Sequence, residues 1–395
     1  MTVSTVRLSH RASRLASKGH PWFFADDLAA NDAEHGTLVR VVDAKGRDLG
    51  IGFHSKRSRI RLRLCGRWEG DGVPDAGEFF AERLGQAVER RKRLGLLEAR
   101  SGARLVHADA DGLPGLVVDR YADALVLQVT SAFVESCYDC MVPYLVEKTG
   151  ADSVWARNDV VHRDREGLPR EVRLVQGRRK EIVEIEEHGV VHEIDLLGGH
   201  KTGFYLDQRL ARSRIMELSR DRSVLDLFSY QGAFALAALS GGATGAIAVD
   251  QSREALQRAC ESASRNDLDG LETERANAFD RLREFRKEER TFDLIVVDPP
   301  PFARRRSERS GALRGYRDLN RNALRLLAPG GHLLACSCSH HVSLPMFEAV
   351  LRQGAAGLPF PVSLVDRIPA GSDHPVWLSL PESEYLKAVL LQRIG

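Results

Sequence analysis

The sequence predicts an α/β protein whose C-terminal half is a doubly wound domain, preceded by a small β-rich segment and a small α/β unit. From about residue 191 onward, strand-like apolar runs alternate with segments of helical periodicity, a pattern typical of a parallel sheet with right-handed crossovers. Before residue 70 the apolar residues recur with period two between turn-forming residues, which indicates strands. The 395 residues are also enough for two or three domains of about 150 residues each.

The composition excludes several classes of protein. With 43% hydrophobic residues the chain resembles proteins that bury a core, not fibrous, collagen-like or disordered ones. Six cysteines at irregular spacings and a start unlike a signal peptide argue against a secreted, disulfide-bonded protein. The uncharged stretch 227–249 is long enough to span a membrane, but its polar and glycine residues favour a turn, a helix and a strand. We therefore expect a cytoplasmic protein that contacts no membrane.

Positive charge is concentrated in the N-terminal segment. Residues 1–70 contain 13 lysines and arginines against 7 acidic residues, whereas the whole chain carries a net charge of +2. Strands are expected here at residues 37–43, 48–54 and 58–65. The last of them places Arg59, Arg61 and Arg63 on one face, which is either a solvated sheet surface or a groove for a phosphate backbone.

A cluster of turn formers at residues 69–76 separates this segment from a second unit. In that unit we expect a helix at residues 78–97 and strands at residues 113–119, 124–129 and 184–190. Cys137 and Cys140 have the spacing of a redox or zinc motif, but no second cysteine pair completes a site, so we expect core thiols and no metal. The predicted domains are residues 1–70, 75–190 and 191–395.

The C-terminal domain should contain, in order, strand 224–228, helix 233–239, strand 246–250, helix 254–266, strand 292–298, helix 316–327 and strand 332–338. In such a sheet the ligand binds at the carboxyl ends of the strands. The first strand leads into Asp226-Leu-Phe-Ser-Tyr-Gln-Gly232, whose single glycine does not indicate a pyrophosphate ligand. The second ends at Asp250, which either accepts hydrogen bonds from a ribose or caps a helix. Adenosine without a pyrophosphate fits, and S-adenosylmethionine is the common cofactor of that kind.

Two further strand ends carry residues suited to chemistry on a nucleobase. Asp298-Pro-Pro-Pro-Phe302 stops one strand and offers a carboxylate, free carbonyls and an aromatic ring. The next strand ends at Cys338, which faces the same crevice if the two strands are neighbours. A thiolate that adds to carbon 6 of a pyrimidine activates carbon 5 for methylation, so Cys338 is the candidate nucleophile and Asp298 the candidate base-binding carboxylate. Cys336 is expected to point to the opposite face of the sheet and to be inert.

These motifs resemble those of the RlmI-type bacterial methyltransferases, which make 5-methylcytosine in large-subunit ribosomal RNA. The resemblance covers nearly the whole chain. It rests on Lys201-Thr-Gly-Phe-Tyr-Leu-Asp-Gln-Arg209, Phe228-Ser-Tyr-Gln-Gly232, Asp298-Pro-Pro with Phe302, Arg314-Gly-Tyr-Arg-Asp-Leu-Asn320 and Cys336-Ser-Cys-Ser-His-His341. It implies an N-terminal PUA-like β-barrel that binds RNA, a small central α/β domain and a Rossmann-like class I methyltransferase domain.

The resemblance also implies roles for individual residues. Cys338 would be the nucleophile, Asp250 would hold the ribose of S-adenosylmethionine, and Asn277 would lie by the adenine. The residues implied to border the cofactor are Phe204, Gln208, Arg209, Asp226, Phe228, Ser229, Gly232, Asp250, Gln251, Asn277, Ala278 and Asp298. Contacts to RNA are expected from Arg59, Arg61 and Arg63 and from Arg304, Arg305 and Arg306, the last three in a loop expected at residues 303–317.

The chain departs from the family pattern at two positions. Pro301 stands where the family usually has lysine, and Asn277 stands where it has aspartate. Many RNA cytosine-C5 methyltransferases carry a second cysteine after the motif proline for product release, and both this chain and the RlmI-type group lack it. No residue is identified that removes the proton from carbon 5.

Two other functions fit the sequence. An enzyme that methylates an exocyclic amino group of an RNA base would also use the Asp298 motif, and a noncatalytic RNA-binding or assembly protein could retain the fold. Cys338 distinguishes the first of these from the leading interpretation, and a turnover assay distinguishes the second. The sequence leaves open which nucleotide is modified, whether the substrate is naked RNA or a ribosomal particle, and whether the chain forms a homodimer.

Overall fold

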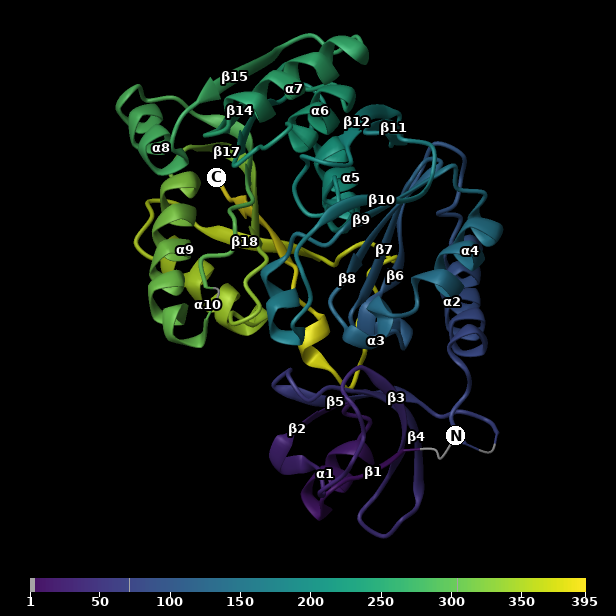
Figure 1. Cartoon of the computed structure of the whole chain (residues 1–395). Coiled ribbons are helices and arrows are strands. Elements are labelled where there is room, and N and C mark those ends of the chain that lie inside the picture. Colours follow the sequence, from purple (N-terminus) through teal and green to yellow (C-terminus); the bar gives the residue numbers. More distant parts are fainter. Residues whose placement is uncertain (1–3, 71, 304) are drawn as a thin grey trace. The chain divides into compact units, whose positions relative to one another are not determined.

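The computed structural model describes residues 4–70, 72–303 and 305–395, and the chain divides into two compact units (Figure 1). The first unit consists of Met1–Ile185, Glu193–Leu206 and Ser372–Ser383. The second consists of Glu186–His192, Asp207–Gly371 and Glu384–Gly395. Because the chain passes between the units several times, the three domain boundaries expected from the sequence stay a prediction.

The N-terminal part of the first unit is a five-stranded sheet in the order β1-β3-β4-β5-β2. Its elements are β1 (Thr5–Arg7), α1 (His10–Ala16), β2 (Trp22–Phe24), β3 (Thr37–Val42), β4 (Asp48–His54) and β5 (Ile60–Gly66). Alternate residues of the strands, among them Val39, Val41 and Leu62, are buried with Phe23 in one core, as period two requires. The three strands expected here correspond to β3, β4 and β5, whereas β1, β2 and α1 were not expected.

The next part of the first unit consists of helices and a second five-stranded sheet, whose strand order is β10-β9-β8-β7-β6. Its elements are α2 (Ala76–Arg93), β6 (Gly102–His107), β7 (Leu116–Tyr121), β8 (Ala124–Val129), α3 (Ala132–Glu135), α4 (Tyr138–Thr149), β9 (Ser153–Arg157) and β10 (Val172–Gly177). Asp75 caps α2 by accepting a hydrogen bond from the N–H of Glu78 at 2.9 Å. Phe79, Phe80 and Leu84 of α2 share a buried core with the sheet.

A hairpin replaces the single strand expected at residues 184–190. Its strands are β11 (Ile182–Glu187) and β12 (Val190–Asp195). The two residues between them, His188 and Gly189, have φ of 52° and 79°. Two successive left-handed residues are the geometry of a tight two-residue hairpin turn, so the chain reverses where a continuous strand was expected.

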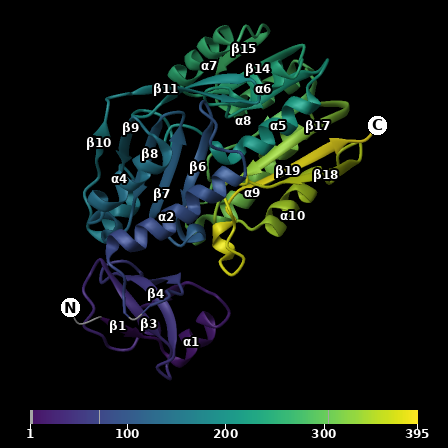
Figure 2. The same cartoon turned by 90° about the vertical axis from the view of Figure 1, so that its right-hand side faces the viewer.

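The second unit is built on a seven-stranded sheet in the order β15-β14-β13-β16-β17-β19-β18. The strands are β13 (Ser223–Leu227), β14 (Gly245–Asp250), β15 (Leu271–Arg275), β16 (Phe292–Val297), β17 (Leu327–Ser337), β18 (Val362–Ile368) and β19 (Lys387–Arg393). The strands from β15 to β17 are parallel. β19 runs antiparallel to both β17 and β18, between which it lies (Figure 2). The sheet is therefore mixed: its strands from β15 to β17 are parallel, as expected, and β19 and β18, which were not expected, add an antiparallel edge.

Helices cover both faces of this sheet, as the doubly wound prediction requires. They are α5 (Arg209–Leu218), α6 (Ala233–Ser240), α7 (Arg253–Arg265), α8 (Ala278–Lys287), α9 (Arg309–Leu324) and α10 (Leu344–Ala355). One buried core joins the strands to α5, α6 and α7, and another joins them to α8, α9 and α10, which lie together in Figure 1. Helix α9 begins at Arg309, before the expected residue 316, so most of the segment 303–317 is helical and not a loop.

Short 3₁₀ turns complete the secondary structure. They are η1 (Ala25–Asp27), η2 (Ala108–Asp111), η3 (Val161–Glu166), η4 (Leu206–Gln208), η5 (Arg306–Glu308) and η6 (Pro381–Ser383). Within the described residues, no helix combines the length and apolar character needed to cross a membrane.

The strand order identifies where a ligand should bind. From β13 the chain proceeds to β14 and β15 on one side and then returns to β16 on the other side of β13. Open α/β sheets bind ligands at such a reversal, outside the carboxyl ends of the strands. The ends of β13, β14, β16 and β17 are therefore where the predicted site residues should meet.

Candidate cofactor and base-binding site

The loop after β13 has an unusual backbone. Phe228, Tyr230 and Gly232 have φ of 61°, 51° and 71°, and for the two residues that are not glycine such conformations cost roughly 1–3 kcal/mol. A Cβ on Gly232 would lie 2.9 Å from the Cβ of Ala259 on α7. Glycine is therefore required at this position both by its conformation and by the close approach of α7. Strained loops of this kind cluster at binding sites.

Asp250, the last residue of β14, is tied to this loop. Its Oδ2 accepts a hydrogen bond from the N–H of Tyr230 at 2.9 Å, and its Oδ1 accepts one from the N–H of Ser252 at 2.9 Å. The N-cap of α7 is Ser252, whose side chain accepts a hydrogen bond from Ala255, so Asp250 is not needed as the cap. Each carboxylate oxygen has a second lone pair, which leaves Asp250 able to accept hydrogen bonds from ribose hydroxyls.

Asp226 is completely buried one residue before the end of β13. Its Oδ2 accepts a hydrogen bond from the N–H of Ala235 at 3.1 Å. Burial raises the pKa of Asp226 well above its ordinary value, against that hydrogen bond, and the charges of Asp298 and Asp250 raise it further. A bound cation would offset the negative charge of these neighbouring carboxyl groups.

Several buried acceptors around Asp226 lack a protein partner. Within the described residues, Asp226 Oδ1, Gln208 Oε1 and Ser229 Oγ are buried without a hydrogen bond. The Nε2 of Gln208 donates to Oδ2 of Asp298 at 2.9 Å, which links Gln208 to the end of β16. Buried polar atoms normally have partners, so these acceptors suit a ligand that brings N–H donors and positive charge. The ammonium group and sulfonium of S-adenosylmethionine have these properties, and the residues present fit that cofactor.

The ends of β14 and β15 meet at a second corner. Asp250 and Arg275 are register partners, and the Nε of Arg275 donates to the carbonyl of Gln251 at 3.1 Å. Asn277 caps α8, because its Oδ1 accepts a hydrogen bond from the N–H of Phe279 at 2.9 Å. Ala278 follows as the first residue of α8. The predicted ribose and adenine residues thus lie at one corner, and the contact of Asn277 with adenine stays a prediction.

Cys338 and the Asp298 segment are also brought together. β16 and β17 pair with Val297 opposite Ala335, and the thiol of Cys338 donates to the carbonyl of Pro299 over 3.9 Å. Cys338 is half-buried and follows the last residue of β17. The expectation that these two strand ends are neighbours is confirmed by this pairing.

The reason given for the inertness of Cys336 was wrong. Side chains two residues apart on a strand share a face, and Cys336 packs in the core with Leu334 and Val296, on the side of α5 and α6. What distinguishes the two cysteines is depth. Cys336 is fully buried, and this burial raises the pKa of its thiol well above the ordinary value. Cys338 lies beyond the end of the strand and is only half-buried.

Aromatic rings line the path from the cofactor loop toward Cys338. The ring centroids of Phe228 and Phe279 are 6.3 Å apart, those of Phe279 and Phe302 are 6.1 Å apart, and those of Phe302 and Tyr316 are 4.6 Å apart. The hydroxyl of Tyr316 lies 2.9 Å from Oγ of Ser339, the residue after Cys338. Phe228, Phe279 and Phe302 are partly exposed and suit the stacking of adenine or of an RNA base, whereas Tyr316 is fully buried.

Some predicted residues have other contacts. Arg209 forms an ion pair with Glu187, with Nε 3.2 Å from Oε2. Phe204 belongs to the first unit, where it is buried and its N–H donates to the hydroxyl of Tyr121 at 3.1 Å. Arg63 is also in the first unit, 3.6 Å from Oδ2 of Asp109 and over the ring of Trp22. The cofactor and RNA roles of these residues stay predictions.

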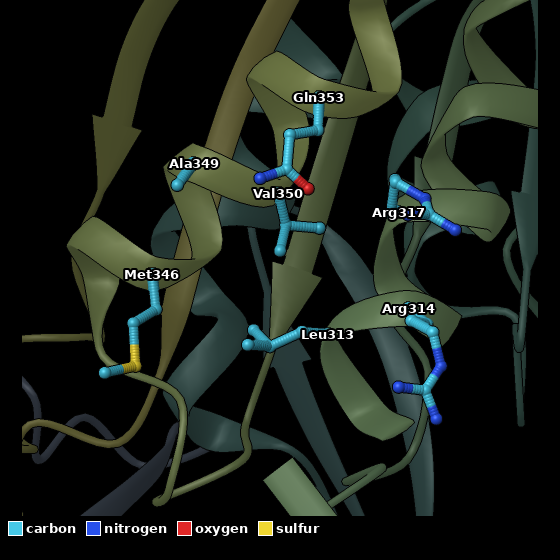
Figure 3. Close-up of a pocket in the computed structure, with 7 residues that line it drawn as sticks. All are labelled: Leu313, Arg314, Arg317, Met346, Ala349, Val350 and Gln353. Carbon is cyan, nitrogen blue, oxygen red and sulfur yellow. The ribbon is translucent and has the colours of Figure 1, made fainter. Parts of the chain in front are cut away.

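The arginine segment before α9 is only partly described. Arg304 lies outside the described residues, whereas Arg305 and Arg306 are exposed. A shallow hollow lies further along, between α9 and α10 (Figure 3). It is lined by Leu313, Arg314, Arg317, Met346, Ala349, Val350 and Gln353. None of the predicted cofactor residues lines it, so it is separate from the crevice at the strand ends.

Lys387 is a site residue that the sequence analysis missed. It is the first residue of β19, is 4% exposed, and is the register partner of Ser337. Its Nζ donates to the carbonyl of Ser339 at 2.8 Å and to that of Tyr385 at 2.6 Å. Burial lowers the pKa of Lys387 to about 8, although the charges of Cys338 and Glu384 act to raise it. The signal in the sequence was a lysine directly before the apolar run Ala388–Leu391.

Comparisons with known proteins agree with this geometry. Residues 145–390 match the S-adenosylmethionine-dependent methyltransferase family, and residues 6–67 match a PUA-like domain. The chain is 38% identical to Ribosomal RNA large subunit methyltransferase I of Aliivibrio fischeri (strain MJ11), and the match covers 98% of each chain. It is also 38% identical to the protein of that name from Shewanella frigidimarina (strain NCIMB 400), with 98% of each chain covered.

A solved structure shows the same fold. The crystal structure of SMU.776 complexed with SAH has a TM-score of 0.85 and 22% sequence identity, and the match covers 98% of this chain and 99% of that one. The chain therefore belongs to the family of S-adenosylmethionine-dependent methyltransferases that includes the proteins named ribosomal RNA large subunit methyltransferase I.

Proposed function

We propose that this protein methylates carbon 5 of a cytosine in large-subunit ribosomal RNA, with Cys338 as the nucleophile. The substrate class is supported by the names of relatives that match over the full length and by the PUA-like domain. The chemistry rests mainly on one observation, the position of the Cys338 thiol 3.9 Å from the carbonyl of Pro299, directly after Asp298. A nucleophile and a base-binding carboxylate thus lie at neighbouring strand ends.

The cofactor would lie along the ends of β13 and β14. Asp226 and Gln208 would hold its ammonium group, Asp250 its ribose, and Asn277 with Ala278 its adenine. When bound, S-adenosylmethionine supplies an electrophilic methyl group on a sulfonium. Asp226 is suited to this position because a bound ammonium group would compensate the charge of its own carboxylate and that of the neighbouring Asp250.

Cys338 and Asp298 would then activate the base. The thiolate electron pair forms a bond from sulfur to carbon 6, and the displaced ring electrons move to N3, which takes a proton from the Asp298 carboxyl group. Carbon 5 is then electron-rich and would accept the methyl group that bound S-adenosylmethionine supplies, the bonding pair remaining with the cofactor sulfur. The proton of carbon 5 passes to solvent water, and the electron pair that it leaves restores the double bond between carbons 5 and 6. The carbon–sulfur bond breaks to release the thiolate, and N3 returns its proton to Asp298.

The test compares wild-type protein with Cys338→Ala and, as a matched control, Cys336→Ala. The substrate is large-subunit ribosomal RNA from a strain that lacks this gene, and the product is identified by nucleoside chromatography. We expect 5-methylcytosine with the wild type, none with Cys338→Ala, and substantial activity with Cys336→Ala. Cofactor affinity should be nearly the same in all three, because the thiol acts on the base.

Other results would identify a different function. Full activity of Cys338→Ala would indicate an exocyclic amino methyltransferase. Cofactor binding by the wild type without methyl transfer would favour a noncatalytic RNA-binding protein. RNA containing 5-fluorocytidine gives a second measurement, because fluorine blocks proton loss from carbon 5 and should trap an adduct that requires Cys338.

A further inference from the structure

The loop that carries Cys338 is held on several sides. Ser339 Oγ contacts the hydroxyl of Tyr316 at 2.9 Å and accepts a hydrogen bond from the N–H of Ala303 at 3.3 Å. The carbonyl of Ser339 accepts a hydrogen bond from Nζ of Lys387 at 2.8 Å. On the other side of Cys338, Ser337 is the register partner of Lys387. The ammonium of Lys387 therefore lies beside the backbone that flanks the nucleophile.

The charge of a buried ammonium must be compensated by its surroundings, and hydrogen bonds to carbonyl groups compensate it only in part. An ammonium has three donors, and two of them are used by the carbonyls of Ser339 and Tyr385. Neutral acceptors do not offset the loss of hydration of a full charge, which requires a nearby anion. Cys338 and Glu384 are the groups whose negative charge favours the charged form of Lys387. Such coupling is reciprocal, so a charge on Lys387 favours the thiolate of Cys338 by the same free energy.

We propose that Lys387 is the positioning residue of the nucleophile, and that its ammonium holds Cys338 in the thiolate form. The proposal rests on the function proposed above. The thiolate is the form that adds to carbon 6, and it is also the form that leaves when the carbon–sulfur bond breaks. An ammonium at this place therefore favours both the first and the last step at Cys338.

The other titratable groups around Cys338 do not supply this effect. Asp298, from the end of β16, is anionic when ionised and would disfavour a thiolate. Burial raises the pKa of Tyr316, from α9, so its phenol stays neutral. Burial likewise keeps Cys336, from β17, neutral. His340 is exposed, and its ring centroid lies 5.5 Å from that of Tyr385. The negative charge of Glu384 acts on Lys387, whose charged form it favours.

The test measures the reactivity of Cys338 directly. Full-length protein is treated with iodoacetamide between pH 5 and pH 10, and alkylation of Cys338 is followed by peptide mass spectrometry, which separates it from the other cysteines. The variants are Lys387→Met, Lys387→Arg and the control Lys287→Met, which changes an exposed lysine at the end of α8. Thermal unfolding and cofactor affinity establish that each variant is folded.

We expect the midpoint of the wild-type pH profile to lie below the value of about 8.5 for an ordinary cysteine. Lys387→Met should raise the midpoint by at least one pH unit and slow alkylation at pH 7 roughly tenfold, since only the thiolate reacts. Lys387→Arg should preserve most of the wild-type reactivity, and Lys287→Met should preserve all of it. Methyl transfer by Lys387→Met should recover as the pH is raised, which a merely structural defect would not do.

Two results would overturn the proposal. One is an unchanged alkylation profile in folded Lys387→Met. The other, which needs no variant to fold, is a wild-type midpoint at or above that of an ordinary cysteine. Because alkylation requires neither RNA nor methyl transfer, these results are distinguishable from failure of the proposed function, which Cys338→Ala tests.

Discussion

At the scale of single residues, Asp250 has a measurable role that is separable from the fold. Its two backbone hydrogen bonds, from Tyr230 and Ser252, leave lone pairs for a ribose. We predict that Asp250→Ala weakens S-adenosylmethionine binding by about 1–3 kcal/mol, the range for hydrogen bonds to a charged group. Asp250→Asn should lose less, because its amide retains one acceptor oxygen. Isothermal titration calorimetry measures both, and unchanged affinity in folded Asp250→Ala would refute the ribose assignment.

Gly232 allows a second prediction, because both its conformation and its surroundings exclude a side chain. Its φ is 71°, and a Cβ there would meet that of Ala259 at 2.9 Å. We predict that Gly232→Ala lowers the free energy of unfolding by about 1–3 kcal/mol and weakens cofactor binding, since the strained backbone and α7 must both shift. The control is Gly245→Ala, where the nearest atom would be 3.5 Å away. Equal effects of the two substitutions, measured by urea unfolding, would contradict this account.

The sequence predicted the grouping of those residues that lie at the carboxyl end of a strand. Asp226, Asp250, Asp298 and Cys338 each follow an apolar run, so the rule that ligands bind at carboxyl ends was enough to group them. Lys387 could not be found in this way. Its closeness to Cys338 depends on the antiparallel pairing of β19 with β17, and nothing local in the sequence specifies which strand β19 joins.

At the scale of elements, the buried group of Glu187, His192 and Arg212 predicts how stability depends on pH. Burial lowers the pKa of His192 to about 4, whereas an unfolded histidine titrates near about 6.5. Between these values the unfolded state binds more protons, so the free energy of unfolding falls as the pH falls from 6.5 toward 4, by up to about 3 kcal/mol.

Burial would raise the pKa of Glu187, but Arg212 and Arg209 lower it to about 2. Its contribution to stability is therefore present above about 4.5 and is lost as the pH falls toward 2.

The measurement is urea unfolding of the wild type and His192→Gln at several values between pH 7 and pH 4. The substitution removes the titrating ring. We therefore predict that the free energy of unfolding of His192→Gln falls less steeply with decreasing pH than that of the wild type, whatever the effect of the substitution at pH 7. Circular dichroism at each pH reports the unfolding midpoint. Identical slopes in the two proteins would mean that other groups cause the acid sensitivity.

Elements were predicted well where pattern alone determines them. β4 and β8 have the expected bounds because their apolar residues are flanked by turn formers. The start of α9 was missed because Gly311 and Gly315 disfavour a helix there. Tertiary packing overrides this preference against a helix. The packing also accounts for one of the glycines, because a Cβ on Gly315 would approach the ring of Phe302 to 3.2 Å. Glycine at this helical position leaves room for the aromatic ring that follows Asp298.

At the scale of the whole molecule, positive charge is placed on both units. In the first unit Arg59 is exposed, whereas Arg63 is already paired with Asp109 and packed on Trp22. Of these two arginines, Arg59 is the more available for a phosphate. In the second unit, residues 303–317 hold six arginines and one glutamate, and Arg305 and Arg306 are exposed. These follow directly after the segment Asp298–Phe302 that is proposed to bind the base.

This arrangement leads to a prediction about RNA capture. A target base in folded RNA must leave its stack to reach Cys338, at a cost of a few kcal/mol, so contacts to the backbone near the base must hold the strand. We predict that replacing Arg305 and Arg306 together by alanine weakens RNA binding and lowers the slope of log affinity against log salt by about 1.5, because each lost phosphate contact removes about 0.7–0.9. Including Arg304 in the substitution should strengthen the effect, and cofactor binding should survive.

The matched control for this prediction is the pair Arg283 and Arg286, which are exposed on α8. Replacing both by alanine removes the same net charge from the same unit without touching the segment after the base-binding residues. If the effect of Arg305 and Arg306 came from overall charge, both double variants would lower the salt slope equally. If it comes from phosphate contacts beside the target base, only the variant of Arg305 and Arg306 should lower the salt slope. Methyl transfer by that variant should also fall, because the base is extruded less often. Filter-binding titrations at several salt concentrations distinguish these results, and an unaltered slope in the Arg305 and Arg306 variant would leave the segment without a role in RNA binding.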